Sequence, residues 1–102
     1  MAEFRCAIRG EIDSVSSPQL YSDLDLAIVT SHGSLVIDCS ELTFMDASGI
    51  SVLIDVHRRL ERLGRGLRIE NLSPQYRRIF EKLELVDVSS AEALQDAASS
   101  MR

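Results

Sequence analysis

The residue types best suited to chemistry gather in one short segment, Asp46-Ala47-Ser48-Gly49. A carboxylate and a hydroxyl stand two positions apart, directly before a segment whose apolar residues have helical spacing. Either side chain could cap that helix, and Gly49 would relax the turn and leave the backbone uncovered. A hydroxyl at a helix N-terminus also lies where backbone N–H groups and the helix dipole favour an anion. Ser48 is therefore suited to carry or contact a phosphate, alongside the simpler interpretation of a helix cap.

The same segment does not indicate a nucleophilic enzyme. The G-x-S-x-G motif needs glycine two positions before and after the serine, where this chain has Asp46 and Ile50. His32 lies in a predicted turn and His57 at the edge of the apolar face of the next predicted helix, so neither has the context of a triad base. The sequence also has no Walker motif and no G-x-G-x-x-G. We expect no enzyme activity and no nucleotide site of these common kinds.

The two cysteines, Cys6 and Cys39, each lie in an apolar, strand-like run and are expected to be buried free thiols. No CxxC motif or Cys/His cluster is present, so we expect neither a metal nor a cofactor. No apolar run approaches the roughly 18–20 residues of a membrane span, and the N-terminus lacks the basic and apolar regions of a signal peptide. We therefore predict a cytoplasmic protein without membrane association.

The charge is unevenly distributed along the chain. The net charge is −5, but residues 1–50 carry eight acids and two bases, a net of −6, while residues 51–102 carry eight acids and nine bases, a net of +1. An acidic protein is a poor nucleic-acid binder, so no nucleic-acid partner is expected. Arg58, Arg62 and Arg65 share one helical face by their spacing, which predicts a solvated face or, alternatively, a secondary partner contact.

Short apolar runs alternate with helical patterns along the 102 residues. We expect a strand or strand pair over residues 4–12, strands over 35–39 and 67–71, a short strand over 85–88, and a loop over 40–48. Helices should follow Ser16-Ser17-Pro18 (a hydroxyl cap with proline in the first turn), Gly49 and Ser73-Pro74, and a last one should run from the capping box of Ser89 and Glu92 to residue 98. This order predicts an α/β fold in one domain, residues 3–98. Its mixed, mostly parallel sheet should have four to five strands and about four helices, with the functional site at the carboxyl ends of strands.

Several motifs together resemble those of STAS domains and, more narrowly, of the bacterial anti-sigma factor antagonists. The central match is an apolar strand ending in Asp38, followed by Leu42-Thr43-Phe44-Met45-Asp46-Ala47-Ser48-Gly49-Ile50. Gly10-Glu11-Ile12-Asp13 resembles the early turn of the family, and further matches bring the coverage to about residues 3–98.

The resemblance implies a protein that binds an anti-sigma factor serine kinase and thereby releases a sigma factor in a stress response. The kinase would then phosphorylate a hydroxyl just before the glycine, and a metal-dependent serine phosphatase would reset the switch. Because Ala47 replaces one of the two possible acceptors, the phosphate would fall on Ser48. The chain departs from many relatives at Ser51, where glycine is frequent. The predicted partner-binding residues are Asp46, Ala47, Ser48, Gly49 and Ser51, together with Asp13, which we expect on the same side of the domain because its turn follows the first strand.

Charge offers a physical mechanism for such a switch, because a phosphate adds about −1.5 to −2 charges beside Asp46 and would repel a partner built around a neutral serine. The free protein is expected to be a monomer. The alternative is a non-catalytic STAS subunit of a transporter, a lipid-trafficking complex or a larger signalling complex, which would need no phosphorylation of Ser48.

Overall fold

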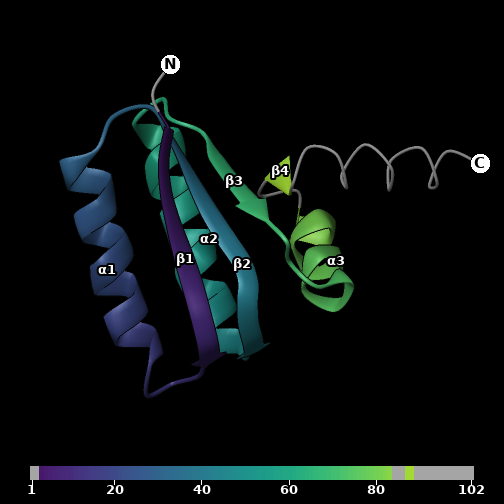
Figure 1. Ribbon diagram of the computed structural model, residues 1–102. Helices are drawn as coiled ribbons and strands as arrows, with labels where there is room; N and C mark the ends of the chain where they lie inside the picture. Colours follow the sequence, from purple (N-terminus) through teal and green to yellow (C-terminus); the bar gives the residue numbers. More distant parts are fainter. Residues whose placement is uncertain (1–2, 84–86, 89–102) are drawn as a thin grey trace, which may run out of the picture.

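The computed structural model describes residues 3–83 and 87–88 and contains two long strands, two long helices and three shorter elements (Figure 1). In chain order the elements are β1 (Glu3–Ile12), α1 (Ser17–Thr30), β2 (Ser34–Met45), α2 (Ala47–Arg62), β3 (Leu67–Glu70), α3 (Pro74–Leu83) and β4 (Asp87–Val88). The strands form one sheet in the order β1-β2-β3-β4, and every neighbouring pair is parallel.

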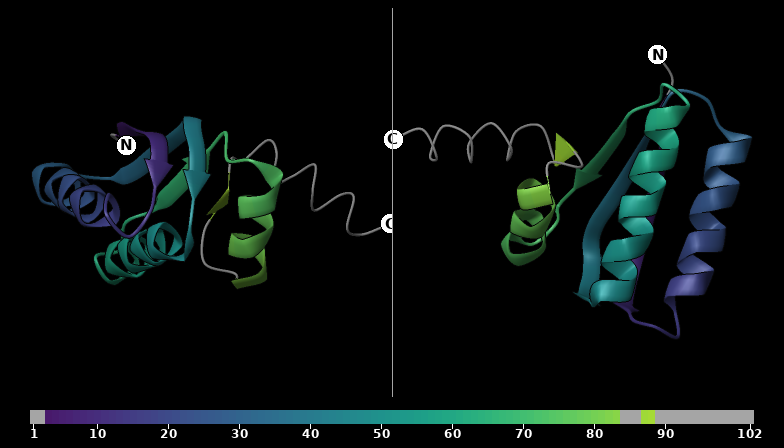
Figure 2. Two further views of the ribbon diagram at one scale, coloured as in Figure 1. Left: turned by 90° about the horizontal axis from the view of Figure 1, so that it is seen from below. Right: turned by 180° about the vertical axis from the view of Figure 1, so that it is seen from behind.

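The two long helices lie side by side on one face of the sheet, as the views from below and from behind show (Figure 2). Their apolar stripes explain this placement. Leu20 and Leu24 of α1 are buried, and Leu53 and Leu60 of α2 are fully buried against the buried side chains of the strands. This layer between helices and sheet is the core, and it orients both helices with their N-termini at the carboxyl ends of β1 and β2 (Figure 1).

The other face of β1–β3 carries charged side chains. Arg5, Val36 and Arg68 occupy matching positions on three adjacent strands and so share this face. Arg5 bonds Glu70 at 2.5 Å, and Arg68 pairs with both Glu3 and Glu70. Val36 is 0% exposed on this face, where the two arginines flank it. The β2 run is thus covered on both faces, by helices on one side and by paired charged side chains on the other.

Strand β2 is longer than the sequence predicts, because residues 40–45, expected to form a loop, continue the strand. Their pairing with β1 provides the reason: Arg9 lies opposite Glu41 and Ile12 opposite Met45, so the long neighbouring strand supplies backbone partners up to Met45. The possible strand pair over residues 4–12 is likewise one strand. Gly10, with φ of 71°, adapts the backbone at one of two register shifts instead of reversing the chain.

The α/β class and the parallel sheet are confirmed, but the expected numbers of elements are not matched. Residues 3–83 and 87–88 contain three helices and a sheet of three strands, to which the two-residue β4 adds at the β3 side. All strand pairs among these residues are parallel, so this part of the sheet is not mixed. The strand count falls because the first apolar run forms one strand. The helix predicted from Ser89 onward lies outside the described residues.

The start of α1 also differs in detail from the expectation. Pro18 lies in the first turn as predicted, but the Ser16 side chain does not cap the helix. Instead, Ser16 Oγ accepts a hydrogen bond from the Asp13 backbone N–H at 2.9 Å and donates to the Glu11 carbonyl at 3.1 Å. The hydroxyl therefore holds the turn between β1 and α1 and leaves the first turn of the helix without a side-chain cap.

Candidate functional site

The candidate site lies where β2 ends and α2 begins, and Asp46 organises it. Its backbone is extended, and its Oδ1 accepts hydrogen bonds from the backbone N–H groups of Ser48 at 2.9 Å and of Gly49 at 3.3 Å. Of the two possible caps, the structure therefore uses Asp46. Ser48 Oγ also donates to the same Oδ1, at 2.5 Å. The serine hydroxyl is thus half-buried at the helix N-terminus, with its proton directed to the capping carboxylate.

These bonds set the charge state of the site. The hydroxyl of Ser48 first, and then the N–H groups of Gly49 and Ser48, lower the pKa of the Asp46 carboxyl below its ordinary value. The negative charge of Asp13 acts in the opposite direction on this pKa. Asp46 is therefore a stable anion at neutral pH and a poor acceptor for full proton transfer.

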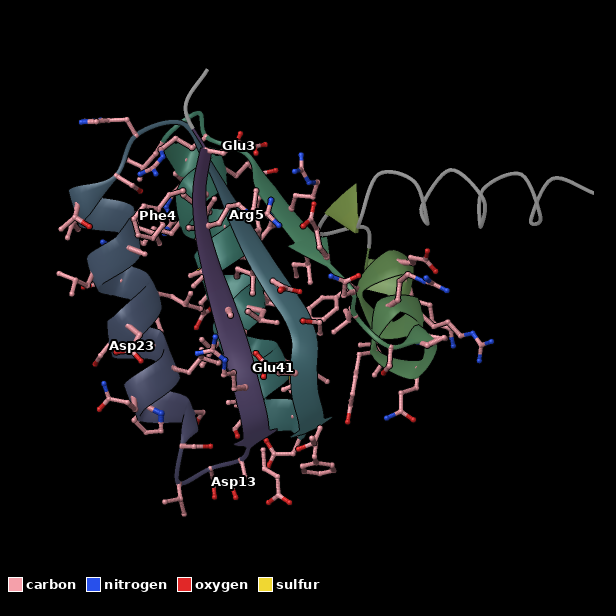
Figure 3. All side chains as sticks on the ribbon, in the orientation of Figure 1. Glu3, Phe4, Arg5, Asp13, Asp23 and Glu41 are labelled. Carbon is pink, nitrogen blue, oxygen red and sulfur yellow. The ribbon has the colours of Figure 1, made fainter. Side chains whose placement is uncertain are left out.

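Asp13 lies near Asp46 at this end of the sheet, as the position of its turn after the first strand predicts. The Asp46 backbone N–H donates to the carbonyl of Ile12 at 3.0 Å, which brings the ends of β1 and β2 together. The Asp13 carboxylate accepts hydrogen bonds from the N–H groups of Val15 and Ser16, and these bonds lower its pKa. Figure 3 shows Asp13 at the lower end of β1, at the same end of the sheet where β2 stops. Two carboxylates held in their charged form therefore stand at one end of the sheet.

Gly49 does not leave the backbone uncovered, contrary to the expectation from the sequence. It is buried, and a Cβ built there would lie 2.7 Å from Cγ2 of Ile12 and 2.7 Å from Cγ of Met45. Glycine allows the first turn of α2 to pack directly on the ends of the two long strands. Its structural role is internal packing, so any contact of residue 49 with a partner is limited by its burial.

The other implied contact residues lie at the surface: Ala47 and Ser51 are exposed, and Asp13 is half-buried. Two apolar residues near them in the chain are not among the predicted contact residues. Val15, on the loop after β1, is 86% exposed, and Phe44, near the end of β2, is 47% exposed. The signal that could have revealed Phe44 is the strand alternation, which places it on the opposite side from the buried Met45.

The family-model comparison matches the STAS domain over residues 6–100. The chain belongs to the STAS domain family. The anti-sigma-B factor antagonist of Bacillus subtilis (strain 168) is 30% identical over 86 residues, which are 84% of this chain and 78% of that protein. By this similarity the STAS domain falls among the anti-sigma factor antagonists.

Solved structures agree with this assignment. An anti-sigma factor antagonist from Mycobacterium paratuberculosis has a TM-score of 0.72 at 25% identity, covering 90% of this chain and 82% of that one. The antagonist SpoIIAA in its unphosphorylated form has a TM-score of 0.71 at 22% identity, covering 94% and 89% of the two chains. The SpoIIAA likeness supports the fold.

Several residues considered in the sequence lie outside the site of this STAS domain. Arg65 follows the end of α2 and does not continue a face with Arg58 and Arg62, because the helix ends at Arg62. Arg65 instead donates to the carbonyl of Ile28 at 2.8 Å, in the last turn of α1, and to that of Gly33 at 2.7 Å, in the loop before β2.

The histidines and cysteines fit the simpler interpretations. His57 is half-buried on α2, with Nε2 3.9 Å from the Glu61 carboxylate, and His32 is exposed between α1 and β2. Both thiols are free; Cys39 is buried and Cys6 half-buried. Across the described residues, no cluster of three or more His, Cys, Asp or Glu side chains could hold a metal ion. Over the same residues, no helix has the length and hydropathy needed to span a membrane.

Proposed function

We propose that this STAS domain binds an anti-sigma factor with serine kinase activity, which releases a sigma factor, and that phosphorylation of Ser48 ends the binding. The observation that carries this proposal is the position of the Ser48 hydroxyl. It is half-buried at the start of α2 and donates to the capping carboxylate of Asp46, and the preceding residue, the exposed Ala47, offers no second acceptor. SpoIIAA, a fold neighbour, has been solved in a phosphorylated form, which supports a phosphorylated state for a domain of this shape.

The proposed contact surface consists of the end of β1, the end of β2 and the first turns of α2. Its polar part contains Asp13, Asp46, Ser48 and Ser51. The exposed side chain of Phe44 adds apolar area at the end of β2. A partner with an apolar surface and hydrogen-bonding groups that fit closely around the neutral Ser48 hydroxyl would complement this surface. Gly49 supports it from below by letting α2 approach the strands.

Phosphorylation would change the charge of this surface without requiring a new fold. The phosphate adds about −1.5 to −2 charges at neutral pH. Asp13 and Asp46, both with lowered pKa, remain charged under these conditions. A partner that docks around the neutral hydroxyl would then face repulsion and a desolvation cost. We propose that a metal-dependent serine phosphatase removes the phosphate, that the domain itself uses no cofactor, and that it acts as a cytoplasmic monomer.

Calorimetry with the kinase-type anti-sigma factor encoded in the same genome tests the binding step. Ser48→Asp should weaken binding at least about 30-fold, which corresponds to about 2 kcal/mol and to a central interface residue. Arg62→Ala is the matched control, because Arg62 is exposed at the opposite end of α2, and it should change the affinity less than about fivefold. Normal binding by Ser48→Asp, with loss of binding by Arg62→Ala, would place the interface elsewhere and overturn the proposal.

Mass spectrometry after incubation with that kinase and ATP tests the acceptor. One phosphate is expected, on Ser48. A phosphate on Ser51 or Thr43 with Ser48 unmodified would contradict the proposal. If the protein is not phosphorylated and Ser48→Asp does not change its activity in the cell, the alternative is favoured, a role as the STAS subunit of a transporter or another complex.

A further inference from the structure

One oxygen atom of Asp46 serves both the helix and the proposed phosphorylation site. Oδ1 accepts the N–H groups of Ser48 and Gly49, which cap α2, and it also accepts the Ser48 hydroxyl at 2.5 Å. The hydroxyl is thus a third donor to the capping atom. A change at Ser48 Oγ must therefore act on the cap itself as well as on the outer surface.

Phosphoryl transfer would remove that third donor. The γ-phosphoryl group of a nucleoside triphosphate would form a new P–O bond with Ser48 Oγ, and its bond to the β-phosphate oxygen would break with the electron pair on the diphosphate. The hydroxyl proton would leave Oγ for the base of the kinase, because the lowered pKa of Asp46 makes it a poor final acceptor. The product would have a phosphate ester oxygen facing Oδ1 where a hydroxyl proton had been.

We propose that Asp46 is the positioning residue of the Ser48 switch: it holds the hydroxyl in the unmodified protein and opposes the phosphate after modification. This inference rests on the proposed phosphorylation of Ser48. In the unmodified state the short hydrogen bond fixes Oγ in one direction, with its lone pairs facing away from the carboxylate. In the modified state the carboxylate and the phosphate would compete for the same two backbone N–H groups.

The surrounding structure limits how far the two anions could separate. The first turn of α2 is pressed against the strands at Gly49, where Ile12 and Met45 leave no room even for a Cβ. The carbonyl of Asp46 also accepts the Ile50 N–H at 3.1 Å, which ties its backbone to the helix. Asp13, on the loop after β1, adds negative charge near Asp46. The repulsion must therefore be met by rotation of the phosphoserine side chain or by weakening of the Asp46 cap.

The test uses the full chain with phosphoserine incorporated at position 48 during translation, so it requires neither a kinase nor a sigma factor. The phosphorylated and unmodified proteins are compared in the wild-type and Asp46→Asn backgrounds. Asparagine also caps helices well but carries no charge. Asp55→Asn is the matched control, since it removes the same charge from an exposed position farther along α2.

The first readout is a phosphorus NMR titration of the phosphoserine. Its pKa, ordinarily about 6, should be higher in the wild-type background than in Asp46→Asn by at least about half a unit, the size of one charge pair across a few ångströms of water. The Asp55→Asn background should give the wild-type value. Equal values in the wild-type and Asp46→Asn backgrounds would overturn the inference, because a purely structural cap would not affect this titration.

The second readout is thermal unfolding of the four proteins. Phosphorylation should lower the unfolding midpoint more in the wild-type background than in Asp46→Asn, because only the wild-type background places the phosphate next to a second anion, the Asp46 carboxylate. An equal shift in both backgrounds would also overturn the inference. Failure of the proposed function would look different: phosphoserine-48 protein would still bind the anti-sigma factor, whatever the titration showed.

Discussion

Replacement of Gly49 by alanine is the sharpest test of how this site is built. Gly49 lies in the first turn of α2, where an added Cβ would lie 2.7 Å from Ile12 Cγ2 and 2.7 Å from Met45 Cγ. Both neighbours are buried, Ile12 at 6% and Met45 at 2% exposure. Ile12 is β-branched and stiff, and the Met45 atom is in the middle of its side chain. Neither can move aside freely, so the helix or the strand ends must shift.

The expected magnitude follows from two opposing effects. Overpacking of a filled core typically costs about 1–3 kcal/mol. Alanine in place of glycine in a helix contributes up to about 1 kcal/mol in the other direction. The net loss should be about 1–2 kcal/mol, which lowers the unfolding midpoint by roughly 5–10 °C in a domain of this size. The larger side chain in Gly49→Leu should prevent stable folding, so that variant cannot be used to measure partner binding.

Thermal unfolding followed by circular dichroism is the assay, with urea unfolding as a second measure of the free energy. Ser51→Ala is the control, because Ser51 is exposed two positions farther along the same helix and should change stability by less than about 0.5 kcal/mol. A midpoint for Gly49→Ala at or above that of the wild type would refute the reasoning. Such a result would mean that the glycine is open to solvent and available to a partner.

Three further predictions concern groups outside the first turn of α2. Tyr76→Phe removes the hydroxyl that accepts the buried Met45 N–H at 3.0 Å, and urea unfolding should register a loss of about 1–3 kcal/mol; a change near zero would mean that another acceptor is available. Arg5 donates to Glu70 and holds the pKa of that carboxyl below its ordinary value of 4.5. The contribution of this ion pair to the free energy of unfolding is fully present above pH 4.5 and is lost as the pH falls through the lowered pKa of Glu70. The unfolding midpoint of the wild type should therefore exceed that of Glu70→Gln by less at acidic pH than at neutral pH. A difference that grows in acid would contradict the proposed effect of Arg5 on Glu70. Burial raises the pKa of the Cys39 thiol to about 12, so iodoacetamide at pH 8 should alkylate Cys6 before Cys39 in the native protein, as mass spectrometry can follow; earlier labelling of Cys39 would show that β2 opens readily.

The local patterns of the sequence were sufficient to predict the three helices of the described residues. The spacing of Leu53 and Leu60 predicted α2, and Pro74 marked the start of α3. The placement of Ser48 at a helix N-terminus also followed from the sequence, because capping residues and apolar periodicity act within a few positions of the chain. The motif resemblance added the family, which the family comparison confirms. The position of Asp13 in the turn after the first strand predicted that it lies near Asp46, and the structure agrees.

The tertiary structure alone decided the features that depend on partners far along the chain. β2 extends to Met45 because β1 lies alongside it. Arg65 lies beyond the end of α2 and binds carbonyls in the last turn of α1 and in the loop that follows it. Gly49 has a packing role because the strand ends meet at its Cα, which no local pattern encodes. The choice of Asp46 as the cap, with Ser48 as its third donor, was likewise open in the sequence, since both residue types cap helices well. The packing of α2 against the ends of β1 and β2 decides which side-chain oxygen faces the free N–H groups at the start of α2. That packing depends on segments far apart in the chain.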